Sequence, residues 1–315
     1  MRRRQATLLA ALTTGATALL TLGVTATGAS ASVGNGPGVS SRPLPYQVFA
    51  PYYEMYDTST DLASLSQQSG AKYLSLAFLQ TAAAGSCTAY WNGDATQPIA
   101  TSSYGTDIAA IQAHGGNVIP SFGGYSADTT GTEIADSCTS VPAIAAVYES
   151  LITTYNVPRI DMDVEADSLT NTAGINRRNE AIAMVEAWAA AHHRQIQFSY
   201  TMPTVPTGLT TAGLAVLQNA VADHAKIATV NILTFDYYLG TQQDMVADTE
   251  SAAAGLFSQL RSLFPRATAR QLWHTIGVTE MPGIDDFGPD ETFSTADAVT
   301  ILQWAQQHGL GLVSF

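Results

Sequence analysis

Three carboxylates alternate along one short segment of the chain, Ile160-Asp161-Met162-Asp163-Val164-Glu165. The apolar residues between them are typical of a buried strand, in which successive side chains point to opposite faces. Asp161, Asp163 and Glu165 are therefore expected to share one face, about 7 Å apart. Repulsion between such neighbours should raise the pKa of at least one carboxyl, so that it keeps its proton near neutrality. Cleavage of a glycosidic bond requires such a protonated carboxyl as its general acid.

Two other interpretations of the same acids stay open at this point. Clustered carboxylate oxygens also suit a hard cation such as Mg²⁺ or Ca²⁺. A purely structural network, satisfied by neighbouring donors, is the other alternative, although burying carboxylates without a task is costly. The histidines show no ligand spacing that joins them to a plausible site, and we expect neither a metal nor a cofactor.

The elements that must position these acids alternate between short apolar runs and segments of helical periodicity. Eight runs are expected to be strands: 46–55, 73–79, 117–122, 159–165, 195–201, 229–235, 274–279 and 311–315. Strands that alternate with helices form a parallel sheet covered on its outside, and about 270 residues suit closure into a barrel. We expect an α/β fold, a (β/α)8 TIM barrel in one domain, residues 45–315, whose carboxylates point into the mouth formed by the strand ends.

Two helices can be recognised from their periodicity. Apolar residues recur at three and four within 179–192, and the segment 294–308 opens on Ser294 as an N-cap and closes before Gly309. The sequence stops at Phe315, within or just after the eighth strand, so no eighth helix is expected to follow it.

The first residues have the layout of a secretory signal peptide. Arg2, Arg3 and Arg4 precede an apolar, uncharged run, and Ala29-Ser30-Ala31 provides a cleavage site. A membrane anchor is the alternative, but Thr and Gly dilute the run. We expect a secreted protein, with cleavage near Ala31 (residues 1–31) and a flexible leader over residues 32–44.

Charge and cysteine content limit the partners. The full chain carries a formal net charge of −13, and loss of the three signal arginines leaves ten basic and 26 acidic residues, a net charge of −16. Such a surface repels phosphate backbones, so nucleic acid is excluded, and after signal cleavage no membrane partner is expected. Cys87 and Cys138 are expected to form a disulfide in an oxidising compartment. The protein is expected to be a monomer.

Several strand-end motifs together resemble glycoside hydrolase family 18, the chitinases and their relatives. Ser121-Phe122-Gly123-Gly124 ends the third expected strand, and Asp161-x-Asp163-x-Glu165 lies on the fourth. The likeness continues in 200–203, in 231–237 with its final Asp-Tyr, and in 309–315, and so covers nearly the whole mature chain.

The resemblance implies substrate-assisted retention, an exception to the two-carboxylate scheme of glycosidases. Glu165 would protonate the glycosidic oxygen and later activate water, while the N-acetyl oxygen of the sugar attacks the anomeric carbon. Asp163 would hold the acetamide N–H, and Asp161 would share a proton or hydrogen bond with Asp163. The resemblance also implies substrate contacts from the residues Asp236, Tyr237, Met202 and Tyr52. Trp91, in the loop after the second strand, is a further candidate for stacking on sugar rings, and burial is its alternative.

The chain departs from the family in two places. Pro158 stands where the family has its first acid, and the family's tryptophan after the eighth strand lies past Phe315. The expected substrate is chitin or a chitooligosaccharide. A sugar-binding protein without turnover and an endo-β-N-acetylglucosaminidase acting on N-glycans are the alternatives on the same fold, and a cation-dependent phosphodiesterase or isomerase is a weaker third.

Overall fold

Eight parallel strand positions form the sheet of the computed structural model, which describes residues 42–57 and 59–315. The barrel strands are β1 (Val48–Phe49) with β2 (Tyr52–Glu54), β3 (Tyr73–Thr81), β5 (Asn117–Gly123), β6 (Arg159–Asp163), β7 (Gln197–Val205), β9 (Thr229–Leu233), β10 (Ile276–Thr279) and β13 (Leu312–Ser314). All eight expected runs are strands, and the acid segment forms most of β6. The fold is the expected TIM barrel-like arrangement.

The first strand is split in a way that joins the two ends of the sheet. β1 pairs with β13 and β2 pairs with β3, and Ala50 and Pro51 stand between them. Ala50 forms hydrogen bonds to both neighbouring strands. Its N–H donates to the carbonyl of Val313 in β13 at 3.1 Å, and its carbonyl accepts from the hydroxyl of Ser75 in β3 at 3.1 Å. The strand order of the sheet therefore begins at β1 and ends at β2, which are the two parts of the first barrel strand.

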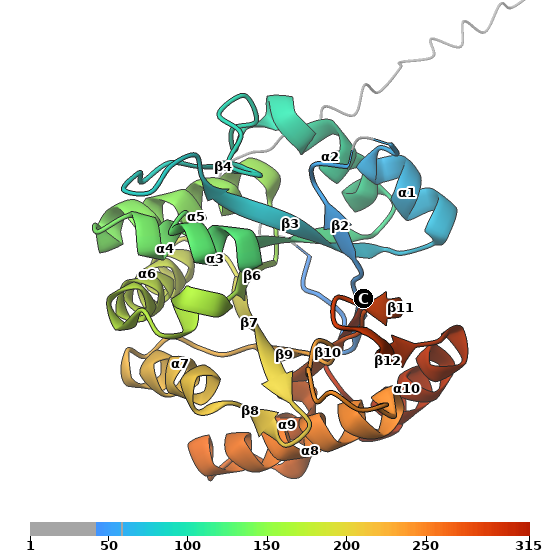
Figure 1. Cartoon of the computed structure of the whole chain (residues 1–315). Helices are drawn as coiled ribbons and strands as arrows, with labels where there is room; N and C mark the ends of the chain where they lie inside the picture. The colour runs from blue at the N-terminus through green and yellow to red at the C-terminus, as the bar shows by residue number, and fades with distance from the viewer. Residues whose placement is uncertain (1–41, 58) are drawn as a thin grey trace, which may run out of the picture. The chain divides into compact units, whose positions relative to one another are not determined.

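Helices surround the strands on the outside, as Figure 1 shows in a view near the barrel axis. They are α1 (Leu62–Ser69), α2 (Thr106–Ala113), α3 (Tyr125–Thr130), α4 (Ile134–Ser137), α5 (Val141–Tyr155), α6 (Thr172–Ala191), α7 (Thr211–Ala222), α8 (Met245–Leu263), α9 (Ala269–Thr275) and α10 (Thr295–His308), with short turns η1 (Thr101–Gly105) and η2 (Ala166–Leu169). The core lies between strands and helices, where Ile160, Met162 and Val164 are buried as expected. Phe315 directly follows β13.

Four short strands lie outside the barrel and were not expected from the sequence. β4 (Ala89–Trp91) pairs antiparallel with β3, and β8 (Gly208–Leu209) pairs antiparallel with β7. β11 (Gly283–Asp285) and β12 (Gly288–Phe293) form a separate hairpin between β10 and α10. These segments are too short, and too poor in regular apolar spacing, to be recognised by periodicity.

The two expected helices are present, with one boundary changed. Ser294 caps α10 in a capping box with Asp297, and Gly309 ends it with a left-handed backbone, φ +75°. The helix expected over 179–192 begins earlier, because Asn171 caps α6 by accepting from the N–H of Gly174 at 3.1 Å. The polar first turn of α6 hid this start from the apolar pattern.

Cys87 and Cys138 form the expected disulfide, 51 residues apart in the sequence. It links the loop after β3 to the end of α4. On the chain-entropy model, closing a loop of this length stabilises the fold by about 4 kcal/mol.

The predicted signal peptide, and the predicted leader up to residue 41, lie outside the described residues. Within the part of the chain that the structure does describe, no helix combines the length and apolar character needed to cross a membrane.

A buried ion pair joins α6 to the turn before α4. Arg178 lies 2.9 Å from Glu133, and both side chains are 1% exposed. Glu133 also caps α4, because it accepts from the N–H groups of Ala135 and Asp136 at 2.8 and 3.0 Å. Removing one partner of such a pair leaves an uncompensated buried charge.

We therefore expect Arg178→Met to lower the free energy of unfolding by about 3–5 kcal/mol, as measured by urea denaturation. The double variant Arg178→Met with Glu133→Gln should lose less than Arg178→Met alone, since the carboxylate nearest to Arg178 is then also removed. Equal stability of Arg178→Met and the unchanged protein would show that the pair does not hold these helices.

Candidate active site

The register of β6 with its neighbours places Asp161 inside the barrel among hydroxyl groups. Ser121 of β5 and Ser199 of β7 stand opposite Asp161, and both donate to its carboxylate, at 2.8 and 2.6 Å. Thr201 donates to it at 3.0 Å, and the Tyr52 hydroxyl lies at 3.3 Å. Burial raises the pKa of Asp161 and these hydrogen bonds lower it. The carboxylate has protein donors on both oxygens and is only 3% exposed.

This arrangement bears on the cation alternative. With both oxygens of Asp161 occupied by hydroxyl donors, little capacity remains for an ion. Among the residues described, no group of three or more His, Cys, Asp or Glu side chains is arranged to hold a metal.

Asp163 lies next toward the mouth and has a different environment. It is 4% exposed, and its Oδ1 has no hydrogen-bond partner among the residues that the structure describes. Burial raises the pKa of Asp163 well above its usual range, and the carboxyls of Glu165, Asp161 and Asp128 act in the same direction. Its protonated form is therefore favoured, although Asp163 lines the cleft.

Glu165 follows the end of β6 and is the more exposed of the cleft carboxyls on this segment. The chain turns here, because Glu165 is extended (φ −130°) and Ala166 is left-handed (φ +39°). Burial raises the pKa of Glu165 to about 7, the backbone N–H of Tyr125 lowers it, and Asp236 raises it. A partly buried carboxyl of this pKa can donate and accept a proton near neutral pH.

Asp128 is a buried acid of this site that the sequence analysis missed. It lies on α3, is 1% exposed, and accepts the backbone N–H of Glu165 on Oδ2 at 2.5 Å. Burial, and after it the nearby Glu133, raise the pKa of Asp128 to about 8. Because Asp128 stands alone in a short polar helix, no spacing in the sequence marks it.

Two glycines allow β5 to pass closely under the site. Gly123 has φ +103°, and a Cβ there would lie 2.1 Å from the carbonyl oxygen of Asp163. Gly124 has φ +85°, and a Cβ there would lie 2.7 Å from the ring of Phe78. The Ser-Phe-Gly-Gly motif thus shapes the turn beneath the acids, because other residues would be strained and would collide.

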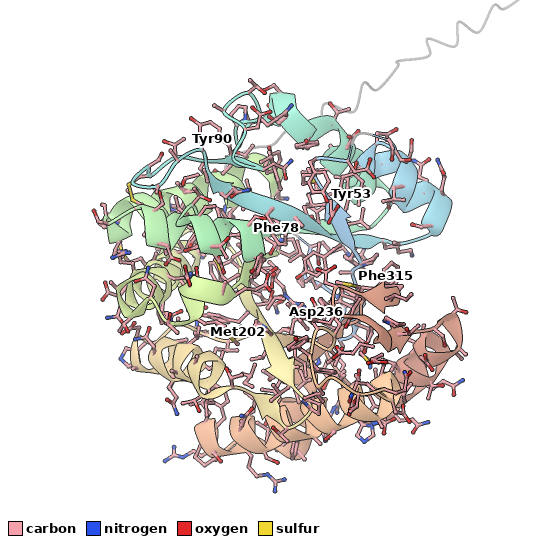
Figure 2. All side chains as sticks on the ribbon, viewed as in Figure 1. Tyr53, Phe78, Tyr90, Met202, Asp236 and Phe315 are labelled. Carbon is pink, nitrogen blue, oxygen red and sulfur yellow. A yellow bond between two sulfur atoms is a disulfide. The ribbon has the colours of Figure 1, made fainter. Side chains whose placement is uncertain are left out.

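The carboxyls open into a cleft of about 810 Å³ at the barrel mouth. Phe78, Asp236 and Phe315, which are labelled in Figure 2, line it from different sides of the barrel. Glu54, Asp163, Glu165, Asp236, Glu280 and Asp286 contribute carboxyls, and none of the lining residues is Lys, Arg or His. A cleft with this lining favours an uncharged or cationic ligand over an anion.

Exposed aromatic rings stand around this cleft. Tyr56 and Tyr125 are 67% and 64% exposed, and Phe287 and Phe315 are 51% and 50% exposed. Flat apolar faces of this kind can stack on the faces of sugar rings. The cleft therefore combines a titratable acid with stacking surfaces.

Of the expected substrate contacts, Tyr52 and Asp236 line the cleft and Trp91 does not. Trp91 is fully buried, donates from Nε1 to the Tyr155 hydroxyl at 3.2 Å, and packs edge-on against Tyr104. The prediction that Trp91 stacks on substrate is wrong. β4 folds back onto β3 and turns this ring into the core, where it is shielded from any ligand.

Met202 and Tyr237 also lie away from the cleft lining, contrary to expectation. Thr201 faces Asp161 inside the barrel, so Met202, the next residue, points outward and is fully buried. Tyr237 is 6% exposed and belongs to the core, and its hydroxyl has no hydrogen-bond partner within the protein. Neither side chain reaches a ligand in this arrangement.

The chain was compared with known proteins by sequence. No family model matches it. It is 32% identical over 287 residues to a probable bifunctional chitinase/lysozyme of Escherichia coli and 31% identical over 289 residues to endochitinase 11 of Metarhizium anisopliae. Each alignment covers 88% of this chain, but 31% of the first relative and 53% of the second. The chain thus spans about a third to a half of these relatives.

The chain is also similar to solved structures of chitinases. The catalytic domain of a hyperthermophilic chitinase from Pyrococcus furiosus is 27% identical, with a TM-score of 0.75 over 89% of this chain and 86% of that one. A family 18 chitinase from Pseudoalteromonas aurantia, 15% identical with a TM-score of 0.57, covers 85% of this chain and 93% of that one and shares the fold. With the carboxylates of β6 at the mouth of this barrel, the chain is similar to chitinases in sequence and shares the fold of the family 18 chitinases.

Proposed function

We propose that the protein hydrolyses the β-1,4 linkages of chitin or chitooligosaccharides, with Glu165 as the acid that protonates the glycosidic oxygen. The observation that carries this proposal is the partly buried carboxyl of Glu165 in the cleft, with its pKa at about 7. Near neutral pH such a group is protonated in a large fraction of molecules and is still able to give up its proton. The similarity to chitinases supports this choice of substrate.

Asp163 supports a substrate-assisted route rather than a protein nucleophile. Because burial raises the pKa of Asp163, this carboxyl is disfavoured as an ionised nucleophile, and the acetamide oxygen of the sugar attacks the anomeric carbon in its place. Asp163 lines the cleft and would hold the acetamide N–H. Asp161, fixed by hydroxyl donors, orients the segment below.

The proton returns to Glu165 in the second half of the reaction. After the leaving group departs with the proton, the ionised Glu165 removes a proton from water, and this water opens the oxazolinium ring. The products are two shorter saccharides, and Glu165 ends in its original state. The exposed aromatic rings and the absence of basic lining residues suit an uncharged polysaccharide.

Export of the protein is part of the same proposal. The basic start, the apolar run and Ala29-Ser30-Ala31 support a cleaved signal, and the Cys87–Cys138 disulfide suits an oxidising compartment. A secreting host should release a protein whose first residue is Ser32, as checked by intact mass. Retention of Arg2–Arg4 in the released protein would contradict cleavage.

Replacement of Glu165 should strongly lower the turnover rate. We expect Glu165→Gln to lower kcat on colloidal chitin by roughly 10²–10⁴, because the amide cannot donate a proton to the leaving oxygen. Glu180→Gln, which makes the same change on an exposed face of α6, is the matched control. Soluble oligosaccharides from each variant are quantified, and equal rates for Glu165→Gln and the unchanged protein would remove the mechanism.

The pH profile should follow Glu165. Its pKa is raised to about 7, so the protonated acid is lost, and kcat/KM falls, as pH rises through about 7. Since Asp236 raises the pKa of Glu165, we expect Asp236→Asn to move this alkaline limb to lower pH. Asp167→Asn, at an exposed position two residues from Glu165, is the control. An unmoved limb in Asp236→Asn would refute the coupling.

A further inference from the structure

The β11–β12 hairpin holds the backbone of the loop that carries Asp236. Asp285 accepts the N–H of Asp236 on Oδ2 at 2.9 Å. Glu291 accepts the N–H of Tyr237 on Oε2 at 2.7 Å and lies 3.4 Å from the N–H of Leu239. Figure 1 shows the hairpin next to β10 and the C-terminal end of the chain, outside the ring of barrel strands. The two carboxyls of the hairpin therefore accept hydrogen bonds from three backbone N–H groups of one loop.

This loop has a backbone that needs such support. Asp236 and Tyr238 both have positive φ, +54° and +53°, which is uncommon for residues other than glycine. A left-handed residue persists where its surroundings fix it. Asp285 and Glu291 accept hydrogen bonds from the N–H groups of Asp236 and of the next residue. These bonds oppose the backbone rotation that would otherwise relieve the strain.

The hairpin also fixes the Asp236 side chain. The N–H of Asp286 donates to Asp236 Oδ1 at 3.2 Å, so the two segments bind each other in both directions. Asp236 lines the cleft with Glu165 and raises the pKa of that acid. Glu165 also lies near Asp163 of its own segment and near the backbone N–H of Tyr125. Burial, followed by the carboxyls of Asp285, Asp286 and Glu291, raises the pKa of Asp236 to about 6.

The two anchoring carboxyls are buried without a cation. Asp285 and Glu291 are 6% and 3% exposed, and neither takes part in an ion pair among the residues that the structure describes. Burial and a hydrogen bond with Asp285 raise the pKa of Glu291. Because buried carboxyls destabilise a fold unless they are bonded, their backbone contacts to the Asp236 loop account for their presence.

We propose that Asp285 and Glu291 are positioning residues that hold Asp236 against Glu165 and so set the strength of the catalytic acid. The inference rests on the proposed function of Glu165. It assigns to a hairpin outside the barrel a part in the reaction that the barrel carboxylates do not fulfil by themselves.

The test compares loss of the hydrogen-bond acceptor with loss of charge. Asp285→Ala and Glu291→Ala remove the acceptors, whereas Asp285→Asn and Glu291→Gln keep an oxygen at the same place. Asp290→Ala on the same hairpin is the matched control, because its side chain is exposed and its backbone carbonyl, which accepts from Gln243 at 2.8 Å, is unchanged. kcat/KM on a chitooligosaccharide is measured from pH 5 to 9, together with thermal unfolding.

We expect both alanine variants to lose roughly tenfold or more in kcat/KM through misplacement of Asp236. Their alkaline limb should move to lower pH, in the same direction as in Asp236→Asn. The amide variants should retain most of the activity, and Asp285→Ala should move the limb no further when it is combined with Asp236→Asn. These effects are expected at temperatures at which every variant remains folded.

Three results would overturn the inference: an alkaline limb of Asp285→Ala that matches Asp290→Ala, amide variants as impaired as the alanine variants, or additive shifts with Asp236→Asn. Each would show that the hairpin acts through charge or stability and not through the position of Asp236. The proposed function fails separately, through full activity of Glu165→Gln on the same substrate, whatever the hairpin variants do.

Discussion

The buried carboxyl of Asp161 determines what the interior of this barrel can contain. A carboxylate taken out of water must receive hydrogen bonds from the protein, and here the donors come from β2, β5 and β7. The polar set continues around the barrel, since Asn231 of β9 donates to Thr201 at 3.1 Å and to Thr279 of β10 at 2.7 Å. Branched aliphatic side chains usually fill the interior of such a barrel, and at this level hydroxyl and amide groups replace them. The strand register is therefore tied to the site, because a slip of one residue would withdraw the donors from Asp161.

The carboxyls that lie nearer to the solvent than Asp161 differ from it in their hydrogen-bond partners and pKa values. Asp161 has its donors, whereas Asp163 and Asp128 each keep an oxygen without a partner and have raised pKa values. Glu165 is less buried and has its pKa at about 7. Burial and neighbouring groups therefore shift the pKa values of chemically similar carboxyls to different extents, as in glycosidase sites where two carboxyls have different roles.

The sequence predicted the barrel and its acids well because short apolar runs mark the buried strands and alternation orients the acids. The eight strands follow from the apolar runs, and the shared face of the carboxylates follows from alternation. Alternation would also have placed Met202 correctly, since Thr201 and Met202 must face opposite ways. The errors lie where local pattern carries no information. Whether Trp91 is exposed depends on a three-residue strand folding back onto β3, and the position of Tyr237 depends on a left-handed residue just before it. Asp128 became part of the site only through a contact with a backbone N–H 37 residues away.

Asp236 shows most clearly why residue type can be predicted when geometry cannot. Its place at the end of the sixth strand is a property of the local sequence, but its backbone conformation depends on Asp285 and Glu291, about 50 residues later in the chain. The barrel presents Asp163 and Glu165 through strand geometry and glycine turns, whereas it has no strand with which to hold Asp236. A hairpin inserted after β10 takes over this role, and its short strands carry no periodic signal. In such a fold the barrel strands place the catalytic acid, and the loops adjust its surroundings. Related chains can therefore keep the acid while their loops change.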